Sequence, residues 1–365
     1  MCHKKLIMLA DDMDYSYSPG HEFEVACLAT SHDSRWIATA SRDNVIIIWD
    51  PSSGAVAHEW LAHQGGVSSL AWSPDSRRLA STGAYTTVVV WGIGNGVMRD
   101  AALEGHTDAV RTCAWSPDGA LIASASKDGT VRVWDGHTYQ QRGLFSNPYP
   151  RGLRFSPNSR YLAWFGESLW IWRPLMGEEP RRLLSHLDPS VFALSFDSES
   201  RRMATAQENL GPADPDASVV RVWDVATGAT LAVLTGHSMA VTDIAFSPDG
   251  RSLLSVSRGD GSAKMWDAES GEQIALFDDV DRDVGAWQAC WSPDGRYIAI
   301  GVYGWDGPHI IGRVQLWRVE DGLCVATVSE HDDAVMCIAF TPDGQFLGSG
   351  DNLGIVHIRR LANFM

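Results

Sequence analysis

One three-part pattern recurs along almost the whole chain. A turn such as Ser116-Pro-Asp-Gly119 is followed by Leu121-Ile-Ala-Ser-Ala-Ser126, a stretch rich in small residues, and then by Val131-Arg-Val-Trp-Asp135. The tryptophan of the third part has these equivalents along the chain: Trp49, Trp91, Trp134, Trp172, Trp223, Trp266, Trp317 and, in a degenerate eighth copy, Arg359. A period of about 40–45 residues with several short strands is typical of repeat folds built from small sheets. Because one such unit cannot bury both of its faces alone, neighbouring units must stack.

Residues 106–135 indicate how one copy folds. Val110–Trp115 is a strand of small and apolar residues, and the Ser-Pro-Asp-Gly turn after it reverses the chain, since Pro sets φ and Gly permits the reversal. Leu121–Ser126 is the second strand, an Asp-Gly turn follows, and Thr130–Trp134 is the β-branched third strand. A weaker fourth strand precedes the next copy, as Thr230–Leu234 does. Each copy is therefore predicted to form four antiparallel strands.

Four polar positions in this copy resemble the His, Ser/Thr, Asp and Trp tetrad of the WD-repeat family. His106, Ser124, Asp128 and Trp134 can form a chain of hydrogen bonds, because the indole donates, the hydroxyl donates and accepts, and the carboxylate accepts. Similar offsets recur in the first and sixth copies, which contain His21, Thr39, Asp43 and Trp49, and His237, Ser255, Asp260 and Trp266. The resemblance implies a WD-repeat β-propeller in which these twelve side chains hold blades together.

The remaining five copies depart from the tetrad. The second has Tyr85 at the Asp position, the fourth and seventh lack the His, and an insertion replaces the turn of the fifth. The eighth keeps its His and Ser but has Leu353 and Arg359 at the last two positions. We expect partial tetrads in the second and fifth blades. The fourth, seventh and eighth are expected to rely on packing, with Trp164, Phe165 and Trp170 serving the fourth.

The copy number predicts an all-β, eight-bladed propeller that forms a single domain over residues 1–365. The approximate repeats are 21–62, 63–105, 106–146, 147–185, 186–236, 237–279, 280–330 and 331–365. The eighth repeat ends without a fourth strand, and the family resemblance implies that residues 3–9 complete the last blade and close the ring. Two alternatives stay open: residues 15–17 as the closing strand, and a seven-bladed ring with an irregular remainder.

Composition and motifs restrict the possible functions. A formal net charge of -16 argues against nucleic-acid binding, and no apolar run is long enough for a membrane span or a signal peptide. The six cysteines are scattered, which predicts reduced thiols in a cytoplasmic protein, with the nucleus as an alternative. No zinc-protease, nucleophile-elbow or Walker motif is present, so we expect no enzymatic activity, no cofactor and no metal.

The positions that break the repeat point to a binding surface. The residue after the leading position of each first strand is variable across the copies: Ala26, Ser68, Arg111, Arg151, Phe192, Thr242, Trp287 and Met336. Arg, Phe, Trp and Met are types that contribute strongly to protein interfaces. Two enlarged turns, residues 207–217 and 303–312, are predicted to project from the same face as these residues.

These observations predict a non-catalytic, monomeric scaffold that binds a protein or peptide through this face. The predicted partner-binding residues are Arg111, Arg151, Tyr149, Phe192, Trp287, Met336, Tyr85, Lys127 and Trp305. One alternative is a small-molecule sensor or enzyme with its site in the central channel of the ring. Another is a structural scaffold that self-associates.

Overall fold

A computed structural model describes residues 20–146, 149–174, 176–184, 190–208, 218–278, 285–306 and 309–363. These ranges contain 31 strands and one 3-10 helix, η1 (Leu361–Asn363). The strands form eight antiparallel sheets, and within each sheet the strands follow one another in chain order. No helix in the described ranges is long and apolar enough to cross a membrane.

Each of the first four blades is a four-stranded sheet. Their strands are β1 (Val25–Thr30), β2 (Ile37–Ser41), β3 (Val45–Trp49) and β4 (Val56–Leu61); β5 (Val67–Trp72), β6 (Arg78–Gly83), β7 (Val88–Ile93) and β8 (Val97–Leu103); β9 (Val110–Trp115), β10 (Leu121–Ser126), β11 (Thr130–Asp135) and β12 (Gln141–Ser146); and β13 (Pro150–Phe155), β14 (Leu162–Gly166), β15 (Leu169–Trp172) and β16 (Arg181–Leu184).

The last four blades repeat this arrangement, with three strands described in the eighth. Their strands are β17 (Ser190–Phe196), β18 (Arg202–Glu208), β19 (Ser218–Asp224) and β20 (Thr230–His237); β21 (Val241–Phe246), β22 (Ser252–Ser257), β23 (Ser262–Asp267) and β24 (Gln273–Asp278); β25 (Gly285–Trp291), β26 (Tyr297–Asp306), β27 (His309–Arg318) and β28 (Leu323–His331); and β29 (Val335–Phe340), β30 (Phe346–Asp351) and β31 (Val356–Arg360).

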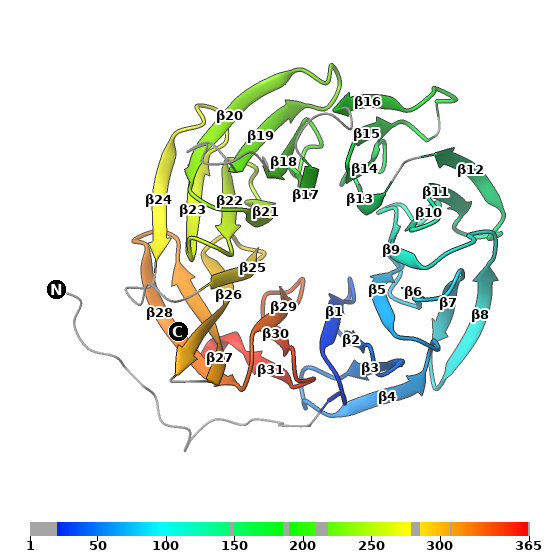
Figure 1. Ribbon diagram of the computed structural model, residues 1–365. Helices are drawn as coiled ribbons and strands as arrows, with labels where there is room; N and C mark the ends of the chain where they lie inside the picture. The colour runs from blue at the N-terminus through cyan, green and yellow to red at the C-terminus, as the bar shows by residue number, and fades with distance from the viewer. Residues whose placement is uncertain are drawn as a thin grey trace.

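The eight sheets form a closed ring around a common axis (Figure 1). The first strand of every blade is the innermost one, and β1 of the first blade packs against β29 of the eighth. The prediction of eight blades is therefore confirmed, and the seven-bladed alternative is wrong. Both expected closing strands, residues 3–9 and 15–17, lie outside the described residues.

Apolar cores fill the spaces between neighbouring blades. Where the ring closes, Val25, Ile37 and Trp49 of the first blade pack against Val356 and Ile358 of the eighth. Second strands such as β10 are buried at every position, since both of their faces meet a neighbouring blade. Continuous burial explains why these strands contain alanine and serine in place of an alternation of polar and apolar residues.

Three of the blades each contain a complete hydrogen-bonded tetrad. In the third blade, His106 Nδ1 lies 2.9 Å from Asp128 Oδ2 and His106 Nε2 lies 2.8 Å from Ser124 Oγ, while Trp134 Nε1 donates to Ser124 Oγ at 3.0 Å. The tetrads of the first and sixth blades have the same geometry. Each tetrad ties the start of the inner strand to the second and third strands of its own blade.

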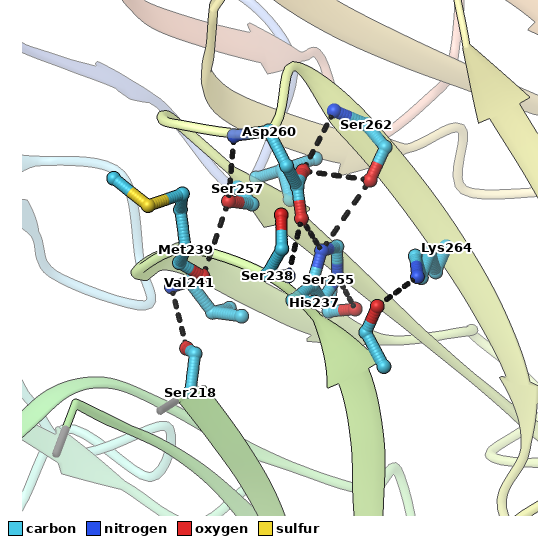
Figure 2. A network of polar contacts seen from close by, with 12 residues as sticks. Ser218, His237, Ser238, Met239, Val241, Ser255, Ser257, Asp260, Ser262 and Lys264 are labelled. Atoms are coloured by element: carbon cyan, nitrogen blue, oxygen red, sulfur yellow. Dashed lines mark hydrogen bonds and ion pairs between the residues drawn. The ribbon is translucent and has the colours of Figure 1, made fainter. Parts of the chain in front are cut away.

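The sixth blade shows that this network continues between blades (Figure 2). Around His237, Asp260 also accepts the backbone N–H of Ser238 at 3.0 Å, which fixes the loop before β21. Next to it, the backbone N–H of Val241 donates to Ser218 Oγ of the fifth blade at 2.9 Å. The position of the inner strand is thus set both by its own blade and by the preceding one.

A substitution of Asp128, the aspartate of the third tetrad, can test how much this network contributes to stability. Burial raises the pKa of Asp128, but hydrogen bonds from Thr130, the Thr107 N–H and His106 outweigh burial and lower the pKa to about 2. Burial lowers the pKa of His106 below 6.5, although Asp128 opposes this shift. His106 is therefore neutral in the folded protein, and the Asp128 carboxylate is charged.

We expect Asp128→Ala to lower the free energy of unfolding at neutral pH by roughly 1–3 kcal/mol, because it leaves buried donors unpaired. Urea unfolding measures the loss, and the exposed Glu104→Ala serves as a control that changes stability by less than about 0.5 kcal/mol. Wild-type stability falls below about pH 6.5, where unfolded histidines take up protons that buried ones do not. An unchanged midpoint for Asp128→Ala contradicts this role.

The eighth blade contains a polar network where the sequence predicted packing alone. Leu353 does not occupy the place of the tetrad Asp, because Asp351, the last residue of β30, reaches His331 directly, with Oδ2 3.0 Å from Nδ1. Ser349 Oγ lies 2.8 Å from His331 Nε2. The carboxylate comes from two residues earlier than in the first and third blades and three earlier than in the sixth, so fixed offsets from the serine did not find it.

Arg359 takes the place of the tryptophan in this network. Its Nη1 donates to Ser349 Oγ at 3.1 Å and its Nη2 donates to Glu330 Oε2 at 2.9 Å. The Arg359 side chain is only 2 % exposed, so the Glu330 carboxylate is needed to offset the cost of burying its positive charge. Burial, together with the charges of Arg359 and His331, lowers the pKa of the adjacent His357 to about 3.

Removing the arginine should destabilise the protein mainly by leaving Glu330 without its partner. We expect Arg359→Met to cost roughly 2–4 kcal/mol, and Arg359→Met combined with Glu330→Gln to recover at least about 1 kcal/mol of that loss. Urea unfolding of both single variants and the double variant completes the cycle. Equal stability of Arg359→Met and the double variant would show that the ion pair is not the cause.

Serines with left-handed backbone conformation link neighbouring blades at the turns between first and second strands. Ser34, Ser76, Ser159 and Ser200 have φ values of 58–61° where the other four blades have glycine. The hydroxyl of Ser159 accepts the backbone N–H of Asp118 in the preceding blade at 2.9 Å, and the other three serines accept equivalent bonds of 2.9–3.1 Å. These bonds offset the strain of positive φ.

Ser159 should therefore tolerate glycine better than alanine. Both substitutions remove the bond to Asp118, but only alanine keeps the left-handed strain, which costs about 1–2 kcal/mol in a non-glycine residue. We expect Ser159→Ala to lower the thermal midpoint more than Ser159→Gly, with calorimetry as the measurement. The opposite order would mean that chain entropy outweighs this strain.

Candidate functional site

Every inner strand has a β-bulge near its start. In β9, for example, Val110 pairs with Ser126 and Thr112 pairs with Ala125, which leaves Arg111 without a partner across the ladder. The residues left out in this way, one per blade, are Ala26, Ser68, Arg111, Arg151, Phe192, Thr242, Trp287 and Met336. They are the eight positions that the sequence singled out as variable.

The bulges place all eight residues on one face of the ring. The chain runs in the same direction in every inner strand, and the pairing of Val110 with Ser126 puts the bulge beside the turn between second and third strands. A bulge also turns its side chain away from the regular pleat. We call this surface, the eight bulged residues with the turns between second and third strands, the bulge face.

Two arginine–aromatic stacks lie on the bulge face, each between adjacent blades. The Arg151 guanidinium lies 4.3 Å from the Phe192 ring centre, which joins the fourth and fifth blades. The Arg258 guanidinium lies 4.7 Å from the Trp287 ring centre, which joins the sixth and seventh. Arg258 was missed by the sequence interpretation, although it follows its second strand as Lys127 follows β10.

Four cations of this face lack anionic partners within the described ranges. Arg111, Lys127, Arg151 and Arg258 form no ion pair there, whereas Arg42, in the equivalent turn of the first blade, is bound to Glu24 at 2.7 Å. Arg111 Nε is in addition buried without a hydrogen-bond partner. The unpaired positive charge of this face is therefore concentrated in the third to sixth blades.

The other bulged residues and the remaining predicted residues differ in their surroundings. Ser68 and Thr242 are engaged within the ring, because their hydroxyls donate to the carbonyls of Val110 at 2.9 Å and Trp287 at 3.1 Å in the next blade. Met336 is half-buried. The aromatic residues Tyr85, Tyr149 and Trp305 are 49–62 % exposed around the rim, and the Tyr85 hydroxyl donates to Gln64 Oε1 at 3.3 Å.

One of the two enlarged turns is visible as an extended hairpin. β26 and β27 each have ten residues and stay paired as far as Asp306 and His309, which projects Trp305 beyond the length of the other hairpins. Most of the other insertion, residues 209–217, lies outside the described residues.

The inner strands contain two further charged residues, Arg154 and Asp243. Burial raises the pKa of Asp243 to about 6, although the Ala289 N–H and the Arg154 charge oppose this shift. The described residues contain no group of three His, Cys, Asp or Glu side chains arranged to hold a metal ion. Burial also raises the pKa of the Cys113 and Cys337 thiols to about 12, so these thiols are protonated.

Comparison with known proteins agrees with this architecture. The model of the WD domain, G-beta repeat, matches residues 15–50, 54–92, 99–135, 228–267 and 322–358, just over half of the chain. The matched segments contain all three complete tetrads.

Three relatives are similar to parts of the chain. Autophagy-related protein 16 of Arabidopsis thaliana is 30% identical over 38% of this chain and 26% of its own length. Nuclear distribution protein PAC1 of Arthroderma otae is 27% identical over 50% of this chain and 42% of its own length. Human apoptotic protease-activating factor 1 is 26% identical over 57% of this chain and 16% of its own length. The matches thus span less than half the length of these relatives.

The repeat matches and the eight-bladed ring together show that the chain belongs to the WD40 repeat family.

Proposed function

We propose that this protein is a non-catalytic interaction platform that binds a protein or peptide through the bulge face. The observation that carries the proposal is the set of bulged residues, where Arg151, Phe192 and Trp287 point out of the blade ladders. Such side chains supply much of the binding energy at protein interfaces. We also propose that the protein is monomeric and located in the cytoplasm.

The variability of these eight positions supports the proposal. Residues that pack between blades repeat from copy to copy, whereas the bulged positions range from alanine to tryptophan. A bulged residue is not required for the ladder, so its side chain is free to serve binding. One relative is named for activating a protease, that is, for acting on another protein.

Affinity capture from the native extract tests the proposal. We expect the wild-type protein to retain partner proteins that Arg151→Glu and Trp287→Ala each reduce by about tenfold or more, because central interface residues dominate binding energy. Quantitative mass spectrometry measures the retained proteins.

Arg77→Glu is the matched control, since Arg77 is an exposed arginine in a turn between first and second strands, on the opposite face of the ring. All variants should keep the wild-type thermal midpoint within a few degrees. Retention of every wild-type partner by both bulge-face variants, or equal loss of partners in the control, contradicts the proposal.

A further inference from the structure

The two arginine–aromatic stacks orient donors toward solvent. A guanidinium that lies over a ring cannot donate in-plane N–H groups to that ring, and neither Arg151 nor Arg258 has an anionic partner within the described ranges. Stacking also restricts the arginine side chain before a ligand binds, which reduces the conformational entropy lost on binding. Each stack therefore presents a fork of N–H donors suited to a carboxylate or a phosphate.

The charges around the stacks favour an anion. Asp128 and Asp260 lie in turns of this sector but are already bonded to tetrad histidines. Among the described residues, Asp108 before β9 and Glu167 after β14 also lie near and form no ion pair with the four cations, while β18 and β24 end in the acidic residues Glu208 and Asp278. This sector thus contains four cations without an ion pair in the described ranges, Arg111, Lys127, Arg151 and Arg258, on a chain with a formal net charge of -16.

The neighbouring surface favours a peptide over a nucleic acid. Beside the stacks lie Met336, half-buried, and the exposed Tyr149 and Trp305, which offer apolar contacts between the cationic points. Binding of a nucleic acid depends on a continuous row of phosphate contacts from many Lys and Arg side chains. Four cations on a strongly acidic chain do not supply such a row.

We propose that the bulge face selects acidic segments of its protein partners, with anionic side chains received by the stacks Arg151–Phe192 and Arg258–Trp287. This inference rests on the proposed function and adds the chemistry of the partner. The two stacks lie between different pairs of blades, so a segment with two separated acidic residues would engage both.

A phage-displayed random peptide library, selected on the full-length protein, tests the inference. We expect the selected peptides to be enriched in Asp and Glu, and the enrichment to disappear on the double variant Arg151→Gln with Arg258→Gln. The matched control is Arg77→Gln with Arg251→Gln, which removes the same charge from exposed turns on the opposite face.

A selected peptide is then labelled with fluorescein and its binding measured by anisotropy. The double variant should weaken binding roughly tenfold or more, and replacing the glutamates of the peptide by glutamine should have a similar effect on the wild type. A version with phosphoserine in place of glutamate distinguishes phosphate from carboxylate as the preferred anion, and tight binding of either supports the inference.

Other outcomes would overturn the inference that the bulge face selects acidic segments. If the selected peptides lose binding to Trp287→Ala but show no acidic enrichment, the proposed function stands and the acidic preference is wrong. Tighter binding of single-stranded oligo-dT than of any selected peptide would identify a nucleic-acid site instead. Failure to select any peptide contradicts both proposals.

Discussion

The structure depends on one constraint: a blade can bury its two faces only against other blades. Its central strands are buried on both sides, as β10 is throughout, and the apolar cores lie between adjacent sheets. The first and last blades face the same requirement, so the chain meets itself where Trp49 packs near Ile358. Closure of the ring is therefore a condition for burying the core, since an open end would expose a full apolar face.

Closure also determines where variable side chains can lie. With eight inner strands running in one direction, a single local irregularity repeated in each blade places eight side chains on one face. The residues next to each bulge keep the ladder pairing, while the bulged residue itself has no partner across the ladder. A repeated scaffold can thus carry Arg111 in one blade and Trp287 in another without a change of fold.

Much of the fold could be predicted from the sequence because its signals are local and repeated. Ser-Pro-Asp-Gly turns and the offsets of His106, Ser124, Asp128 and Trp134 recur often enough to count blades. The exceptions depend on geometry in three dimensions. Asp351 replaces the tetrad aspartate from a different position because its carboxylate lies within reach of His331. Ser159 looks ordinary in sequence, and its positive φ is explained only by the hydrogen bond that it accepts from the preceding blade.

The candidate site was harder to predict than the fold. The eight variable positions were recognisable, but nothing in the sequence indicated that Arg258 stacks on Trp287 of the next blade, because contacts between blades join residues from different repeats. Eight of the nine predicted partner-binding residues are aromatic or basic, which indicates binding but does not predict how the side chains are arranged.

Hydrogen–deuterium exchange of the protein alone and with a captured partner tests the central claim most directly. The account predicts slower exchange in the segments that contain the bulges and in the turns after β10, β14 and β22, with no change in the turns between first and second strands. Protection confined to that opposite face, or to the outer strands, would contradict it.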